Sequence, residues 1–270
     1  MVSISMSYLR CDRRSVTKEY RPPTAAILEL RLDSKLKPSL PDGIRIYAVS
    51  DVHGRADLLR RVFAAIDLHL SRAGPALALH VFLGDYIDRG PDSRETIDLL
   101  IERSRRHESI FLKGNHEAFL AEVMQDAARL DAWKDYGGFQ TLMSYGITPS
   151  LKPDRAEGDE LVRALQNTMP FQHQQFFRSL RPSFVCGDFF FAHAGVRPGV
   201  PLRRQREEDL LWIRDEFLQS EQDFGKFIVH GHTPVAKPDI RPNRINIDTG
   251  AYATGILTLL TIQGDRMVAI

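Results

Sequence analysis

The sequence predicts an α/β protein in which central mixed β-sheets are flanked by helices. Short apolar runs alternate with amphipathic helical stretches between residues 44 and 112, and a second series of apolar runs follows residue 183. The order strand–helix–strand with short links favours right-handed crossovers and a largely parallel start to the sheet. In addition, five of the apolar runs lead into a side chain that can bind a metal ion. Because open α/β sheets bind ligands at the carboxyl ends of their strands, we expect the functional site there.

The composition is typical of an ordinary globular protein. The chain has 270 residues, and its 36 Lys and Arg residues nearly balance 35 Asp and Glu residues, so we expect no nucleic-acid partner. No apolar run approaches the ~20 residues of a membrane span and no signal peptide is visible, so no membrane association is expected. The two cysteines, Cys11 and Cys186, lie far apart, which favours reduced thiols in a cytoplasmic protein. The sequence carries no signal for an oligomeric state.

Residues 1 to about 24 are predicted to form a flexible basic arm in front of a single domain that spans residues 25–270. Basic residues outnumber acidic ones in this arm, and Arg21-Pro22-Pro23 closes it. A tail draped over the surface explains this composition, and a docking segment for an acidic partner or nucleic acid is the alternative. Residues 26–32 alternate well enough for an edge strand.

The first half of the domain is predicted to contain three strands, two helices and an insertion. The strands cover residues 44–49, 77–82 and 109–112, and the helices cover residues 57–70 and about 93–105. The first helix places Leu58, Val62 and Ile66 on one side at helical spacing. Residues 118 to about 180 show no strand pattern, so we expect a helical insertion over one edge of the site.

The second half is predicted to return to strands. Residues 183–186 and 189–192 form a hairpin around Gly187-Asp188. Residues 196–225 are expected to form a loop. Further strands are predicted at residues 226–229, 245–247, 256–262 and 266–270, of which the last two form a closing hairpin.

The polar residues that follow the strands form the most informative pattern in the chain. They are Asp51, His53, Asp85, Asn115, His193 and His232. Taken singly, each is more typical of a turn, a cap or a packed histidine, but their joint occurrence predicts a two-metal site. Oxygen and imidazole ligands without thiolate suit manganese, iron or zinc. One carboxylate can bridge two ions ~3.5–4 Å apart, and Asp85 is the natural bridge because it lies between the other donors in the chain.

Five motifs carry a family resemblance: Ser50-Asp51-Val52-His53-Gly54, Gly84-Asp85-Tyr86-Ile87-Asp88-Arg89-Gly90, Gly114-Asn115-His116-Glu117, His193-Ala194-Gly195 and Gly231-His232. Together they resemble the signature of the metallophosphoesterase (calcineurin-like) superfamily. More narrowly they resemble its phosphoprotein phosphatase branch, which includes bacterial serine/threonine phosphatases and symmetrical diadenosine tetraphosphatases. The resemblance runs from Ile44 to Ala251 and implies a β-sandwich with a dinuclear site at the carboxyl ends of the strands. Ser50 departs from the glycine that is usual in the family, but serine is also small.

The resemblance also implies how the ligands are shared between two divalent ions, with manganese as the expected metal. One ion would take Asp51, His53 and Asp85, and the other would take Asp85, Asn115, His193 and His232. His230 competes with His232, but the family histidine follows the glycine, which selects His232. Asp248 matches a family segment near the metals and is expected to support the site rather than to bind an ion.

The remaining predicted site residues handle the phosphate. The two ions would activate a water molecule for attack on phosphorus. By resemblance His116 would protonate the leaving oxygen, and Asp88 would orient His116 and raise its pKa. Arg89 would grip phosphate oxygens through its planar fork, and Arg214, in the stretch 212–214, resembles a second phosphate-binding arginine of the family.

The expected reaction is phosphoric ester hydrolysis, with a phosphorylated protein or a small phosphate ester as substrate. A serine/threonine protein phosphatase is the leading hypothesis, because the stretches 198–201 and 209–212 resemble bacterial members of that group. A symmetrical diadenosine tetraphosphatase is the alternative, for which residues 133–139 could supply one wall of an adenine slot; helical packing around Gly137-Gly138 is the other explanation of that segment. A non-catalytic phosphate- or protein-binding module is least favoured, because every predicted ligand and His116 are present.

Overall fold

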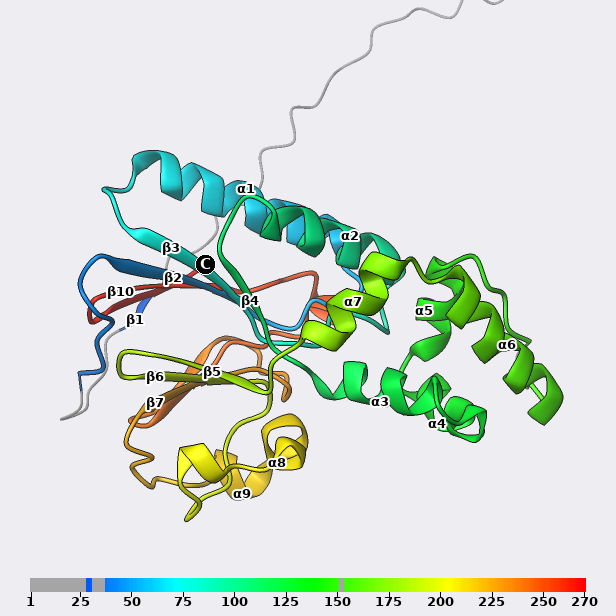
Figure 1. Ribbon diagram of the computed structural model, residues 1–270. Helices are drawn as coiled ribbons and strands as arrows, with labels where there is room; N and C mark the ends of the chain where they lie inside the picture. The colour runs from blue at the N-terminus through cyan, green and yellow to red at the C-terminus, as the bar shows by residue number, and fades with distance from the viewer. Residues whose placement is uncertain (1–27, 31–36, 151–152) are drawn as a thin grey trace, which may run out of the picture.

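The computed structural model describes residues 28–30, 37–150 and 153–270, and it arranges them in four layers (Figure 1). A first sheet packs face to face with a second, and helices cover the outer side of each. The fold class predicted from the sequence is therefore confirmed. The predicted arm of residues 1–24 lies outside the described residues, and of the predicted strand 26–32 residues 28–30 are observed.

The first sheet has the order β1-β11-β10-β2-β3-β4 and is mixed. Its strands are β1 (Leu28–Leu30), β2 (Ile44–Val49), β3 (Leu77–Phe82), β4 (Ser109–Phe111), β10 (Leu259–Gln263) and β11 (Arg266–Ala269). Strands β2, β3 and β4 are parallel, as predicted, whereas β10 runs antiparallel to β2. Strands β10 and β11 form the predicted closing hairpin, but β10 starts at Leu259 instead of residue 256, because Ile256 is exposed in the stretch before it.

The second sheet has the order β5-β6-β7-β9-β8. Its strands are β5 (Ser183–Cys186), β6 (Phe189–Ala192), β7 (Phe227–His230), β8 (Asp239–Ile240) and β9 (Arg244–Asn246). The hairpin of β5 and β6 is confirmed, and β6, β7 and β9 are parallel. Each sheet thus contains three parallel strands, and the loops after these strands carry the predicted ligands.

Alternation along β2 explains why the sheets pack as layers. Ile46 and Ala48 belong to the core between the two sheets, whereas Tyr47 and Val49 belong to the core under helix α1 (Ala56–Arg72). Successive side chains of a strand point to opposite faces, so a strand with both faces buried reads as a continuous apolar run. Helix α2 (Ser93–Ser104) lies beside α1 on the same face (Figure 1).

The predicted insertion is helical and lies beyond one end of the sheets, in the green region at the right of Figure 1. Its elements are α3 (Asn115–Val123), η1 (Ala127–Arg129), α4 (Leu130–Asp135), α5 (Gly138–Ser144), α6 (Arg155–Thr168) and α7 (Phe171–Ser179). Helix α3 starts earlier than expected. Asn115 and His116 therefore occupy the first turn of a helix, where the backbone fixes their directions.

The segment 196–225, expected as a loop, contains three short helical turns. They are η2 (Leu202–Arg204), α8 (Glu207–Trp212) and α9 (Asp215–Leu218), and a further turn, α10 (Ala251–Thr254), follows β9. Elements of three to six residues are too short to show helical periodicity, which is why the pattern missed them. Elements η2, α8 and α9 cover the outer face of the second sheet, where Phe217 and Leu210 pack on Phe190 and Ile228. Within the described residues, no helix combines the length and apolar character that a membrane crossing requires.

Candidate metal centre

The turns after the strands are built in an uncommon backbone conformation. Among the described residues, the non-glycine residues with positive φ are five: His53, Asp85, Asp88, Arg89 and His232. All five are predicted site residues, and such angles cost about 1–3 kcal/mol each for residues with a side chain. The turn around Asp85 and Tyr86 is held by the buried carboxylate of Glu117, which accepts both of their backbone N–H groups at 2.9 and 2.8 Å. This strain is therefore maintained by surrounding contacts.

Two histidines present an unprotonated nitrogen to the carboxylate of Asp85. His53 Nδ1 donates to the carbonyl of Ile87 and His193 Nδ1 donates to that of Leu83, both at 2.9 Å. The Nε2 atoms then carry lone pairs, and they lie 3.5 and 3.4 Å from Asp85 oxygens. Burial lowers the pKa of His53 to about 3 and also lowers that of His193, so both rings are neutral at pH 7. Lone pairs facing a carboxylate need a cation between them.

Side chains from both sheets converge on a second cluster around Asp85. Asn115 Oδ1 lies 2.9 Å from His193 Nε2 and 2.8 Å from His232 Nδ1. The ligand atoms of Asp85, His193 and His232 all lie within 4.8 Å of one another, and so do those of His53, Asp85 and His116. Asp85 belongs to both groups, which is the arrangement expected of a bridging carboxylate.

Buried negative charge accumulates at this centre. Asp51 Oδ2 accepts the backbone N–H of His232 at 2.9 Å, whereas Asp51 Oδ1 is buried without a hydrogen-bond partner. Burial, together with the charges of Asp248 and Asp85, raises the pKa of Asp51. A Cβ atom on Gly231 would lie 2.1 Å from that same Oδ1, so only glycine lets the second sheet approach this carboxylate. The carboxylates of Asp51 and Asp85, neutral imidazoles and an amide oxygen form a donor set that suits divalent cations.

His116 is placed as a proton donor beside this cluster. Its Nδ1 lies 2.7 Å from Asp88 Oδ2, and its Nε2 is buried without a partner, 3.8 Å from Asp85 Oδ2. Burial favours the neutral ring, but the negative charges of Asp85 and Asp88 outweigh burial and raise the pKa of His116. The structure thus brings together the predicted acid and its predicted carboxylate, with Nε2 aimed at the centre.

The insertion supplies further partners of Asp88 that the sequence did not indicate. Trp133 Nε1 donates to Asp88 Oδ2 at 2.8 Å, and Thr141 Oγ1 donates to Asp88 Oδ1 at 2.6 Å. Trp133 is fully buried and cannot line the adenine slot considered for residues 133–139, whereas Tyr136 of the same segment is exposed. The packing explanation of Gly137-Gly138 holds: a Cβ atom on Gly138 would lie 2.2 Å from the Trp133 ring, and Gly137 O accepts the backbone N–H of Arg89.

The two predicted phosphate-binding arginines differ in how firmly they are held. The Arg89 guanidinium lies 4.6 Å above the centre of the Tyr252 ring, and Tyr252 contacts His53 edge to face. Arg214 is exposed at the start of α9 and reaches Thr233 Oγ1 at 3.4 Å. Because Thr233 directly follows His232, this contact places Arg214 near the second cluster. Tyr252 had no motif that could have predicted it.

His230, the competing ligand, and Asp248, the expected supporting residue, lie outside the two clusters. His230 ends β7 and packs on the outer side of the second sheet, where its ring centre lies 5.0 Å from that of Phe217 and Arg244 Nη1 approaches its Nε2 at 3.4 Å. Asp248 accepts the backbone N–H of Gly250 at 2.8 Å and so shapes the turn before α10. Burial, reinforced by Asp85, raises the pKa of Asp248 to about 6.

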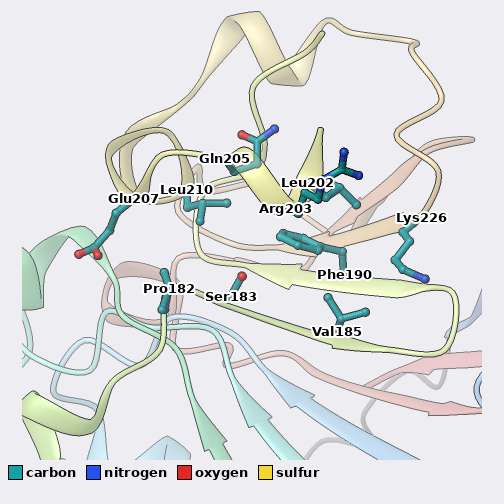
Figure 2. A pocket seen from close by; sticks show the side chains of 10 residues that line it. All are labelled: Pro182, Ser183, Val185, Phe190, Leu202, Arg203, Gln205, Glu207, Leu210 and Lys226. Carbon is teal, nitrogen blue, oxygen red and sulfur yellow. The ribbon is translucent and has the colours of Figure 1, made fainter. Parts of the chain in front are cut away.

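A separate cavity of about 560 Å³ lies on the outer side of β5 and β6, as Figure 2 shows. Phe190 and Leu210 line its apolar wall, and Arg203, Glu207 and Lys226 surround its opening. None of the predicted site residues lines it.

Comparison with known proteins establishes the family. A family model described as calcineurin-like phosphoesterase matches residues 44–255, so this protein belongs to the calcineurin-like phosphoesterase family and is a phosphoester hydrolase. The resemblance inferred from the motifs is confirmed.

Individual relatives are more distant. The bis(5'-nucleosyl)-tetraphosphatase PrpE (asymmetrical) of Halalkalibacterium halodurans is 26% identical over 239 residues, which cover 82% of this chain and 92% of that protein. The solved structure of a cold-active protein-tyrosine phosphatase from a psychrophilic Shewanella species has a TM-score of 0.55 at 18% identity, and the match covers 92% of this chain and 86% of that one. A provisionally named diadenosine tetraphosphatase has a TM-score of 0.57 at 18% identity, over 86% of this chain and 97% of that one. These two structural matches confirm the fold.

Proposed function

We propose that the protein hydrolyses dinucleoside tetraphosphates with the help of two divalent cations, of which manganese is the expected one. The observation that carries the proposal is the extent of the match to a relative named as a bis(5'-nucleosyl)-tetraphosphatase, which includes 92% of that protein. The name of that relative specifies asymmetrical cleavage, whereas the motif resemblance suggested symmetrical cleavage. Asymmetrical cleavage of the tetraphosphate chain yields a triphosphate and a monophosphate, so the products distinguish the two.

The donor set supports an assignment of ligands to the two ions. Asp51, His53 and Asp85 would hold one ion, and Asp85, Asn115, His193 and His232 would hold the other. When bound, the cations would polarise the phosphoryl group and activate a water molecule for attack on phosphorus.

The remaining side chains would act on the phosphate and on the leaving group. Arg89 and Arg214 would bind non-bridging phosphate oxygens, and Tyr252 would keep the Arg89 guanidinium in place. His116 would give its Nε2 proton to the leaving oxygen, and Asp88 would hold the opposite nitrogen and so aim the ring.

A serine/threonine protein phosphatase is the second candidate, and the His116–Asp88 pair favours it. A serine or threonine alkoxide is a poor leaving group and needs a proton, whereas a nucleotide phosphate leaves readily without one. A buried, carboxylate-supported acid is therefore more valuable for an alkyl ester. A phosphorylated protein accordingly stays a candidate substrate. A cytoplasmic location is part of the proposal and is supported by the free, buried thiol of Cys186.

The decisive experiment measures kcat/KM in manganese for diadenosine tetraphosphate, a phosphothreonine peptide and a generic aryl phosphate. We expect the dinucleotide to be the best substrate and chromatography to show ATP and AMP as products. Two molecules of ADP would establish symmetrical cleavage. A higher kcat/KM for the peptide than for the dinucleotide would overturn the proposal in favour of the second candidate.

A further inference from the structure

Exposed aromatic side chains gather around the candidate metal centre. Among the described residues, the large exposed aromatics are Tyr136, Phe171, Trp212 and Tyr252. Three of these four contact a site histidine: Tyr136 contacts His116, Trp212 contacts His232 and Tyr252 contacts His53. Solvent-exposed aromatic rings are costly to keep without a partner, so their concentration at one site points to a ligand with an apolar, flat part.

Tyr136 and Trp212 form a corner on one side of the centre. Their ring centres are 6.5 Å apart and their planes meet at 81°, and the side chains are 42% and 38% exposed. The corner is preformed, because Phe119 of α3 supports Tyr136 with a ring contact at 5.3 Å, and the neighbours of Trp212, Leu211 and Ile213, are buried. Tyr136 directly follows α4 and Trp212 is the last residue of α8, so only the folded site brings the two rings together.

Tyr252 does not offer the same opportunity. The Arg89 guanidinium lies over its ring at 4.6 Å and occupies one face, while its contact with His53 is edge to face at 5.4 Å. Tyr252 therefore orients an arginine, whereas the Tyr136–Trp212 corner has exposed ring surface and no cation over either ring among the contacts of the described residues.

We propose that Tyr136 and Trp212 form a stacking corner for the nucleobase of the leaving nucleotide. This inference rests on the proposed function and assigns a place to one base of the substrate. The side is set by His116, whose ring lies 5.9 Å from that of Tyr136 and whose Nε2 would donate its proton to the leaving oxygen. That oxygen belongs to the phosphate chain of the departing nucleotide, so this chain would lead past His116 to a base held at Tyr136 and Trp212.

Perpendicular rings suit a nucleobase better than a peptide. A flat base can stack on one ring while its edge meets the face of the other, and both arrangements are favourable between aromatic groups. Stacking is tolerant of base identity, because every base has a π face. A peptide backbone lacks such a face and would use the corner less well.

The kinetic test replaces each ring by leucine and compares two substrates. Tyr136→Leu and Trp212→Leu are assayed on diadenosine tetraphosphate and on a phosphothreonine peptide without aromatic residues. For the dinucleotide we expect kcat/KM to fall about 5- to 100-fold, mainly through KM, and the loss for the peptide to be several-fold smaller. Phe171→Leu removes a more exposed aromatic from α7, away from the centre, and should leave both rates unchanged. Equal losses on both substrates would overturn the stacking corner.

A fluorescence titration measures binding at the Tyr136–Trp212 corner without requiring turnover. The chain has two tryptophans, of which Trp133 is fully buried and Trp212 is exposed, so quenching by a ligand reports on Trp212. In the manganese-loaded enzyme ATP should quench this fluorescence, and inorganic tripolyphosphate, which has the same phosphates but no ring, should not. Tyr136→Leu should weaken the ATP response. Equal quenching by both ligands would contradict the proposal.

The two tests also separate the corner from the proposed function. If the wild-type enzyme fails to cleave diadenosine tetraphosphate, the proposed function is wrong, and the fluorescence titration alone decides whether a base binds at the corner. If the enzyme cleaves the dinucleotide but the variants lose activity equally on both substrates, the function stands and the corner is wrong.

Discussion

The strand-end turns and the helical segment 133–141 contribute to the same site in opposite ways. Three of the six predicted ligands, His53, Asp85 and His232, have positive φ, and the ligand atoms of the site face one another at 2.8–3.5 Å. Segment 133–141 carries no predicted ligand. Its Trp133 and Thr141 side chains donate hydrogen bonds to Asp88, so their polar groups have partners within the chain.

The two regions differ in the partners of their side chains. The proposed ligands in the turns would bind a cation, whereas Trp133 and Thr141 bind other residues of the chain. In the turns, buried carboxylates and histidine nitrogens form a donor set whose charge a divalent cation would balance. In segment 133–141, each buried polar group already has its partner. Changes in the turns should therefore alter metal content together with rate, whereas changes in segment 133–141 should alter rate alone.

The largest effect is expected for Asp85→Asn, which removes the carboxylate shared by both clusters. Turnover should fall by more than about 1,000-fold, and both ions should bind more weakly, because the amide cannot bridge two cations. Metal content after gel filtration and turnover of an aryl phosphate measure the two effects. Asp131→Asn, which neutralises an exposed carboxylate on α4, is the matched control. Retention of two tightly bound ions would refute the bridging role.

The second largest effect is expected for His116→Asn. His116 links the two regions, because it lies beside Asp85 and binds Asp88. Metal content should persist, and the rate should fall about 100- to 10,000-fold for substrates with poor leaving groups. Aryl phosphates whose phenols differ in pKa provide the measurement: the loss should grow as the leaving group becomes more basic. A loss that is the same for every leaving group would remove His116 as the general acid.

Smaller effects are expected in segment 133–141. Trp133→Phe and Thr141→Val each delete one hydrogen bond to the buried Asp88 carboxylate, and a bond to a charged group is worth about 1.5–3 kcal/mol, so rates should fall about 10- to 100-fold. Metal content should stay at the wild-type value, which is the critical contrast with Asp85→Asn.

Thr141→Ser keeps the hydroxyl and is the matched control for Thr141→Val. In the His116→Asn background, Trp133→Phe should cost little further rate, because both residues act through the same carboxylate. Additive losses, or loss of metal from either variant, would show that segment 133–141 does more than position Asp88.

The smallest effect is expected outside both regions, at His80 in β3. Burial, aided by the charges of Arg103 and His107, lowers the pKa of His80 to about 3. The unfolded chain, with a histidine pKa near 6.5, then binds the extra proton between these values, so stability falls as the pH falls. From pH 7.5 to 5.5 this histidine should cost about 1.4 kcal/mol of unfolding free energy.

Urea unfolding at the two pH values, in the presence of chelator, measures this loss, and His80→Gln should reduce it by that amount. An unchanged pH dependence in His80→Gln would contradict the assignment. This buried histidine gives a reference for how much protonation alone changes stability when no ligand is involved.

The two regions also differ in how far the sequence predicted them. The strands ending before Asp51, Asp85 and His193 were predicted with nearly correct bounds, because a strand buried on both faces is a continuous apolar run. The ligands follow such runs directly, so placing the strands placed the ligands. The structure brings all six into the two neighbouring clusters and their immediate surroundings.

Segment 133–141 was predicted less well, because its contacts cross long stretches of sequence. Trp133 donates a hydrogen bond to the carboxylate of Asp88, 45 positions away in the sequence. The residues beside it in the sequence do not indicate whether a tryptophan is buried or faces a ligand. Tyr252 and the short helices α8 and α9 were missed for the same reason: tertiary packing, not local periodicity, determines them.

The division of the ligands between two sheets has a consequence for unfolding. Asp51, His53, Asp85 and Asn115 follow strands of the first sheet, whereas His193 and His232 follow strands of the second. A cation bound to both groups would act as a reversible cross-link across the interface between the sheets. This cross-link can form only after the two sheets have packed together. Such a ligand binds the native state alone and stabilises it by mass action. Chelation should then shorten the lifetime of the folded protein as well as stop its chemistry.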